Sequence, residues 1–211
     1  MTLREAALAE NPLIAILRGL EPENAIAVAD VLVDAGFKFI EVPLNSPEPL
    51  KSIRLIADKY GKTVMVGAGT VLSHDDVANV VEVGGQLIVA PNMNPGVGAQ
   101  ALEHGAMWCP GVATPTEAFE ALELGAAVLK FFPAEYIPPA AIRAMRAVLP
   151  TQTVIAIVGG ITPTTMDDYL DAGANSFGLG SALFKPDYSI DELQTRATAF
   201  VDAFNKRTQQ V

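Results

Sequence analysis

The fold is decided by the segment Glu123-Leu124-Gly125-Ala126-Ala127-Val128-Leu129-Lys130-Phe131-Phe132-Pro133. Its first three residues are typical of a helix end, because a glycine just past the last turn readily takes the left-handed backbone angles needed there. A continuous apolar run follows, and such runs are typical of parallel strands that are covered on both faces. The segment therefore predicts a helix that leads directly into a buried parallel strand.

This helix-ending signal recurs along the chain. It appears again at Asp34-Ala35-Gly36, Glu82-Val83-Gly84, Glu103-His104-Gly105 and Asp171-Ala172-Gly173. With further stops at Tyr60-Gly61 and Leu149-Pro150, the spacing is about 20 to 25 residues, the length of one strand plus one helix. The apolar runs between the stops predict strands at about residues 13–18, 38–44, 63–69, 87–91, 107–112, 127–132, 153–159 and 176–180.

Eight strand–helix units predict an α/β fold, a (β/α)8 TIM barrel that forms a single domain over residues 1–211. A short leading helix is expected over residues 3–10, and a terminal helix from about residue 190 to residue 206. A doubly wound open sheet is the alternative. No GxGxxG motif occurs, which counts against the dinucleotide-binding form of that sheet.

Composition narrows the function classes. The 211 residues are 50% hydrophobic and carry 24 acidic against 14 basic residues, a net charge of −10. The basic residues form no run, so a nucleic-acid surface is not expected. An anionic substrate would have to be held by local groups rather than by the overall field.

The cysteine content and the N-terminal residues indicate the cellular compartment in which the protein is expected. The single Cys109 excludes an internal disulfide and fits a reducing environment. The N-terminal residues lack the apolar core of a signal peptide, and no apolar stretch approaches the length of a membrane span. A cytoplasmic protein without membrane contact is expected.

Lys130 is the most informative candidate for chemistry. Burying an ammonium ion is costly, so a lysine inside an apolar run is paired or functional. Burial favours the neutral amine, which can form a Schiff base with a carbonyl compound. The alternative is a lysine at a strand end whose head group reaches into water.

Two further charged residues fall at predicted strand ends, where the active sites of such barrels lie. Arg18 ends the first strand, and Glu41 stands in the second between apolar neighbours. The second and sixth strands lie on opposite sides of an eight-stranded barrel, so Glu41 and Lys130 are expected to face each other. A buried ion pair that only stabilises the barrel is the alternative reading.

A phosphate site is predicted after the last two strands. Gly159-Gly160 ends the seventh strand, and Gly178-Leu179-Gly180-Ser181 ends the eighth. Loops at these positions commonly bind phosphate in TIM barrels, since glycines let backbone N–H groups approach the phosphate oxygens. No metal site is expected, because His74 and His104 lie at helix ends, Cys109 is alone and Glu41 is the only acid at a strand end.

These residues resemble the 2-keto-3-deoxy-6-phosphogluconate (KDPG) and 6-phosphogalactonate (KDPGal) aldolase family over essentially the whole chain. The motifs that carry the resemblance are Ile40-Glu41-Val42, Gly67-Ala68-Gly69-Thr70-Val71, Leu129-Lys130-Phe131-Phe132-Pro133 and Val158-Gly159-Gly160-Ile161. The resemblance implies that Lys130 forms the Schiff base and Glu41 is the general acid and base. It places Thr70 at the substrate carboxylate and Gly159, Gly160, Gly180 and Ser181 at the phosphate.

Within the family, the chain is more similar to the galactonate branch. That branch resembles Ile16-Leu17-Arg18-Gly19 and Leu44-Asn45-Ser46-Pro47, whereas the gluconate branch has an arginine at the position of Asn45. The gluconate branch also tends to have threonine where Val158 stands. A hydroxyl there could bind a substrate hydroxyl in one configuration, so Val158 is a candidate specificity residue.

The resemblance implies a lyase that uses neither a cofactor nor a metal and that cleaves a phosphorylated keto-deoxy sugar acid to pyruvate and D-glyceraldehyde 3-phosphate. It also implies a homotrimer. In such an enzyme, Arg18 and Thr70 would bind the substrate carboxylate. The enzyme's place would be in carbohydrate metabolism, in galactonate degradation. Three alternatives stay open: a KDPG aldolase acting on the C4 epimer, a phosphosugar isomerase or epimerase, and a non-catalytic barrel that binds sugar phosphates.

Overall fold

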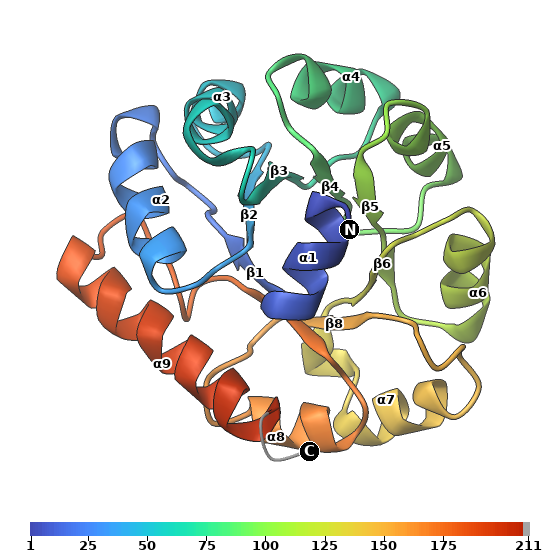
Figure 1. Cartoon of the computed structure of the whole chain (residues 1–211). Coiled ribbons are helices and arrows are strands. Elements are labelled where there is room, and N and C mark those ends of the chain that lie inside the picture. The colour runs from blue at the N-terminus through green and yellow to red at the C-terminus, as the bar shows by residue number, and fades with distance from the viewer. Residues whose placement is uncertain (209–211) are drawn as a thin grey trace.

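The computed structural model describes residues 1–208 and shows a barrel of parallel strands inside a ring of helices (Figure 1). The sheet order is β5-β4-β3-β2-β1-β9-β8-β7-β6, and every pair is parallel. The barrel prediction is confirmed. The strands are β1 (Leu13–Ile16), β2 (Phe39–Pro43), β3 (Met65–Gly69), β4 (Leu87–Val89), β5 (Met107–Cys109), β6 (Gly111–Val112), β7 (Leu129–Phe131), β8 (Ile155–Val158) and β9 (Ser176–Leu179).

The fifth predicted strand, residues 107–112, differs from the prediction because it is divided into β5 and β6. Pro110 stands between them, and proline has no N–H to donate to a ladder. The chain still closes the barrel here, since β5 pairs with β4 and β6 pairs with β7. The Pro110 carbonyl accepts a hydrogen bond from the Lys130 N–H at 3.0 Å. This bond holds the backbone of Lys130 beside the segment between β5 and β6.

Five helices, α2, α4, α5, α6 and α8, end at the acid–x–glycine motifs that the sequence carries. At the five acid–x–glycine motifs the glycine has a φ between +71° and +102°, as a left-handed helix end requires. Gly61 is different, because its φ is −62°. The helices are α1 (Leu3–Glu10), α2 (Ala25–Asp34), α3 (Pro49–Tyr60), α4 (His74–Glu82), α5 (Pro95–Glu103), α6 (Pro115–Glu123), α7 (Pro139–Arg146), α8 (Met166–Asp171) and α9 (Ile190–Thr208), with short 3-10 turns η1 (Pro22–Asn24) and η2 (Ala134–Tyr136).

The leading helix α1 covers one end of the barrel (Figure 1). Its Ala7 is buried in a cluster with residues at the beginnings of strands, including Phe39, Met65, Leu87 and Met107. This cluster fills the interior beneath α1, so the N-terminal end of the barrel is closed by apolar packing. The opposite end of the barrel, where the strands have their C-terminal ends, is therefore the end at which an active site can form.

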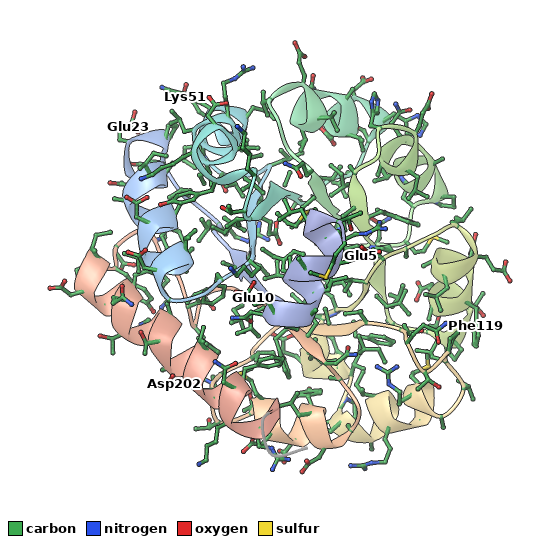
Figure 2. All side chains as sticks on the ribbon, viewed as in Figure 1. Glu5, Glu10, Glu23, Lys51, Phe119 and Asp202 are labelled. Atoms are coloured by element: carbon green, nitrogen blue, oxygen red, sulfur yellow. The ribbon has the colours of Figure 1, made fainter. Side chains whose placement is uncertain are left out.

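The larger core lies between the strands and the surrounding helices, with members such as Ile40, Trp108 and Phe177 fully buried. Charged side chains such as those of Glu23, Lys51 and Asp202 lie on the outer surface (Figure 2). Within residues 1–208, no helix is long and apolar enough to cross a membrane. The predicted domain runs to residue 211, and its last three positions lie outside the described residues.

Candidate active site

A cavity of about 520 Å³ opens at the C-terminal ends of the strands. Its wall combines Arg18, two residues beyond the end of β1, Glu41 of β2 and Lys130 of β7 with glycines at and just after the ends of β8 and β9. Every site residue predicted from the sequence lines this one cavity: Arg18, Glu41, Thr70, Lys130, Val158, Gly159, Gly160, Gly180 and Ser181. The structure brings these residues together, and their chemical roles remain predictions.

Lys130 is the central residue of β7 and is only 8% exposed. Its strand neighbours are small, Gly111 on β6 and Ala156 on β8, which leaves interior space for the long side chain. The amine nitrogen lies 4.8 Å from the centre of the Phe132 ring. Burial is the main cause that lowers the pKa of Lys130, with Arg18 acting in the same direction and Glu41 against it. The amine faces the cavity rather than bulk water.

Glu41 enters the same cavity from β2 and is 2% exposed. Its Oε2 atom has no hydrogen-bond partner. Burial raises the pKa of Glu41 to about 7, although the charges of Lys130 and Arg18 oppose this. A carboxyl group with such a pKa can both take and give a proton near neutral pH.

Glu41 and Lys130 are not paired in any of the salt bridges that the described part of the chain forms. They nevertheless influence each other's pKa, so they share one electrostatic environment. A buried ion pair that serves stability alone would require direct contact and satisfied oxygens. An unpaired amine and an unpaired carboxyl oxygen in one cavity instead match an active site that has space for a reactant between them.

The space around Glu41 depends on Gly69, the last residue of β3. A Cβ atom at this position would lie 1.4 Å from Glu41 Oε2, which is a direct collision. The sequence predicted that Gly69 ends a strand. Its close approach to the carboxylate became visible only in the structure.

Gly69→Ala is therefore expected to displace the Glu41 carboxylate and to lower kcat/KM at least about 100-fold, because misplacing a catalytic group by about 1 Å has effects of this size. Steady-state kinetics would measure the loss. Gly105→Ala is the matched control, since a Cβ there meets no atom within 4 Å and its φ of +71° costs only stability. Equal activity of the two variants would contradict this role of Gly69.

Arg18 is held by the turn that follows β2. Its guanidinium donates a hydrogen bond to the Asn45 side-chain oxygen. One residue on, the Gly19 N–H donates to the Ser46 hydroxyl at 3.0 Å. The Asn-Ser pair therefore ties the end of β2 to the end of β1 and directs the arginine, which is otherwise exposed, along the cavity wall.

Thr70 follows β3 with a φ of +58°, in the left-handed region. A β-branched residue rarely takes this conformation, which costs about 1 to 2 kcal/mol. Strained backbone of this kind gathers at functional sites. Thr70 lines the same cavity as Arg18 and Lys130.

The glycine-rich end of the cavity follows β8 and β9. Gly159 and Gly160 have φ values of +117° and +62°, so side chains are disfavoured at both positions. A Cβ at Gly180 would meet no atom within 4 Å, so open space lies beside it. Turns of this kind can expose backbone N–H groups to the oxygens of a phosphate.

Several lining residues were not singled out from the sequence. Phe132 stacks near the amine, while Glu135 and Lys185 add two charges at the glycine-rich end. Lys185 lies four positions beyond Ser181, so its nearness along the chain was the available signal. Glu135 belongs to η2, a turn that the strand and helix patterns did not reveal.

Cys109 is buried in the barrel interior. Burial raises the pKa of the Cys109 thiol to about 12, so the nucleophilic thiolate is not formed near neutral pH. Among the described residues, no group of three or more His, Cys, Asp and Glu side chains could hold a metal ion.

The chain is similar to known aldolases over most of its length. The family model "Aldolase: KDPG and KHG aldolase" matches residues 4–197. The 2-dehydro-3-deoxy-6-phosphogalactonate aldolase of Escherichia coli strain K12 is 45% identical over 94% of this chain and 97% of its own length. A probable enzyme of the same name from Rhizobium meliloti strain 1021 is 47% identical over 93% of this chain and 92% of its own. The 2-dehydro-3-deoxy-phosphogluconate aldolase of Treponema pallidum is more distant, at 34% over 80% of this chain and 79% of its own.

Solved structures give the same relationship. A structure described as native KDPGal superposes with a TM-score of 0.92 and 45% identity, over 94% of this chain and 96% of the other. A KDPG aldolase from Legionella pneumophila, with pyruvate captured as a covalent carbinolamine intermediate, has a TM-score of 0.79 and 25% identity, over 97% of both chains. The family model covers almost the whole barrel, and two relatives exceed 40% identity over nearly full length. This chain belongs to the KDPG and KHG aldolase family.

Proposed function

We propose that this protein is a class I aldolase that cleaves 2-dehydro-3-deoxy-6-phosphogalactonate to pyruvate and D-glyceraldehyde 3-phosphate. The observation that carries the proposal is the shared cavity of Lys130 and Glu41, two buried groups whose pKa values are shifted toward neutrality from opposite sides. The similarity to enzymes named for this reaction supports the substrate.

The first step is attack of the neutral Lys130 amine on the C2 ketone of the substrate. Nitrogen forms a bond to carbon, the carbonyl oxygen leaves as water after gaining protons, and a protonated imine results. Burial of Lys130 favours this step because it increases the fraction of neutral amine. The imine then withdraws electrons from the neighbouring bonds.

The second step breaks the bond between C3 and C4. Glu41, in its carboxylate form, takes the proton of the C4 hydroxyl, and the electrons of the C3–C4 bond move to the imine to give an enamine. D-Glyceraldehyde 3-phosphate leaves. Glu41 returns the proton to C3, and hydrolysis of the new imine releases pyruvate and free Lys130. A carboxyl pKa of about 7 suits both directions of proton transfer.

Substrate binding is divided between the two ends of the cavity. Arg18 and Thr70 would hold the carboxylate next to the ketone, at the end where Lys130 lies. The glycine pair Gly159-Gly160, together with Gly180 and Ser181, would hold the phosphate through backbone N–H groups and a hydroxyl. A homotrimeric assembly stays part of this proposal.

Val158 would influence which C4 epimer is cleaved, because it lines the cavity from the end of β8 beside the glycine pair. Val158→Thr keeps the shape and adds a hydroxyl, so we expect kcat/KM for the gluconate epimer to rise about tenfold relative to the galactonate epimer. Parallel cleavage assays with both epimers would measure this ratio. Val158→Ala, which adds no hydroxyl, is the control, and an equal shift in both variants would contradict the hydrogen-bond explanation.

The direct test of the proposed function is cleavage of the two purified epimers, with pyruvate release followed through a coupled reductase. We expect a higher kcat/KM for the galactonate epimer. A higher value for the gluconate epimer would favour the alternative aldolase. No cleavage of either, by a folded protein that binds them, would favour a non-catalytic barrel for sugar phosphates.

A further inference from the structure

Two charged side chains of the cavity have no part in the mechanism above. Lys185 lies in the loop after β9, a few residues beyond Ser181, and Glu135 lies in η2 after β7. Both are exposed, and both line the cavity together with Gly159 and Gly160. Neither forms a salt bridge among the described residues.

The position of Lys185 is supported by a chain of contacts. Its ammonium nitrogen lies 5.5 Å from the centre of the Tyr188 ring, and the Tyr188 hydroxyl donates to the Ser181 carbonyl at 3.3 Å. Arg196 of α9 packs on the same ring at 4.4 Å and donates to the Ala182 carbonyl at 3.0 Å. The loop that carries Lys185 is thus attached to α9, next to the backbone of Ser181.

The Glu135 carboxylate lies close to the glycine pair. Its Oε2 would lie 2.4 Å from a Cβ at Gly159, and its Oε1 3.4 Å from a Cβ at Gly160. The carboxylate therefore faces the turn that would receive a phosphate. A phosphate monoester carries a charge of roughly −1.5 to −2 at pH 7, so it is repelled by a carboxylate placed there.

We propose that Lys185 binds the substrate phosphate and that Glu135 opposes it, so that the two set the affinity for phosphorylated substrates in opposite directions. This inference rests on the proposed function. Glycine N–H groups donate hydrogen bonds but carry no net charge, and the chain as a whole has a charge of −10. A local cation would therefore strengthen the binding of a phosphate in this cavity, and a lysine acts as a point charge for phosphate.

The test is steady-state cleavage of the phosphorylated substrate by single variants. Lys185→Met should raise KM about three- to tenfold with a much smaller change in kcat, and Lys185→Arg should restore most of the affinity. Glu135→Gln should lower KM about two- to threefold. Both effects should shrink in high salt, because exposed charges are screened.

Lys62→Met is the matched control. It removes the same charge from an exposed position between α3 and β3, at the barrel end that α1 covers. Its KM should stay at the wild-type value. Competitive inhibition by inorganic phosphate gives a second readout, and it should weaken in Lys185→Met and strengthen in Glu135→Gln.

Equal KM values for Lys185→Met and Lys62→Met would overturn the inference, as would a rise in KM for Glu135→Gln. Trapping of pyruvate on the protein separates these failures from a failure of the proposed function, since pyruvate carries no phosphate. Wild-type protein that traps pyruvate and cleaves the substrate, with no effect of Lys185→Met, would overturn this inference alone. Wild-type protein that does neither would overturn both.

Discussion

Replacing Lys130 with alanine is expected to abolish aldol cleavage, with kcat/KM reduced on the order of 10⁴-fold or more, because the covalent route is lost with the amine. The fold should persist, since the Lys130 amine faces the active-site cavity rather than the packed core. Steady-state assays of pyruvate release, together with a thermal unfolding curve, would test both statements.

Lys130→Met is a useful companion, because methionine keeps much of the side-chain volume without an amine. Both variants should be inactive and folded. Ordinary turnover by either variant would show that Lys130 does not form the intermediate, and the role of Glu41 as its partner would then lose its basis.

Glu41→Gln is expected to separate imine formation from turnover. The amide has nearly the same shape but cannot take the C4 hydroxyl proton, so kcat should fall about 10²- to 10⁴-fold. Pyruvate should still react with Lys130, because the amine is intact. Single-turnover trapping alongside steady-state cleavage would measure the two steps separately.

The pH dependence gives a second readout for Glu41. The carboxylate is the active form in cleavage, and burial raises the pKa of Glu41 to about 7, so the wild-type rate should increase as the pH rises through about 7. This limb should disappear from the residual activity of Glu41→Gln. A limb that is unchanged in the variant would assign the ionisation to another group.

Much of the fold could be predicted because local signals repeat. A glycine such as Gly125 marks a helix end by its backbone freedom, and the apolar run that follows it marks a strand covered on both faces. The division of the fifth strand was not predicted. The division arises because Pro110 has no N–H to donate between the part of the chain that pairs with β4 and the part that pairs with β7. The residues of one strand do not show which neighbours that strand pairs with.

Site residues could be predicted where the residue type is unusual for its place in the sequence. Lys130 and Glu41 stand out because charged groups in apolar runs are costly, and the glycine pairs stand out because they end consecutive strands. Residues without such a signal were missed. Gly69 is ordinary as a strand end until a Cβ there is placed against Glu41, and Lys185 is an ordinary exposed lysine until its loop is placed beside Ser181.

Borohydride trapping with pyruvate is the measurement that decides whether Lys130 forms a Schiff base. Reduction of the imine fixes pyruvate on the chain, and intact mass followed by peptide mapping locates it. We expect one stable adduct on Lys130 in the wild-type protein and none in Lys130→Ala. A folded wild-type protein without an adduct, or with the adduct on another lysine, would contradict this role of Lys130.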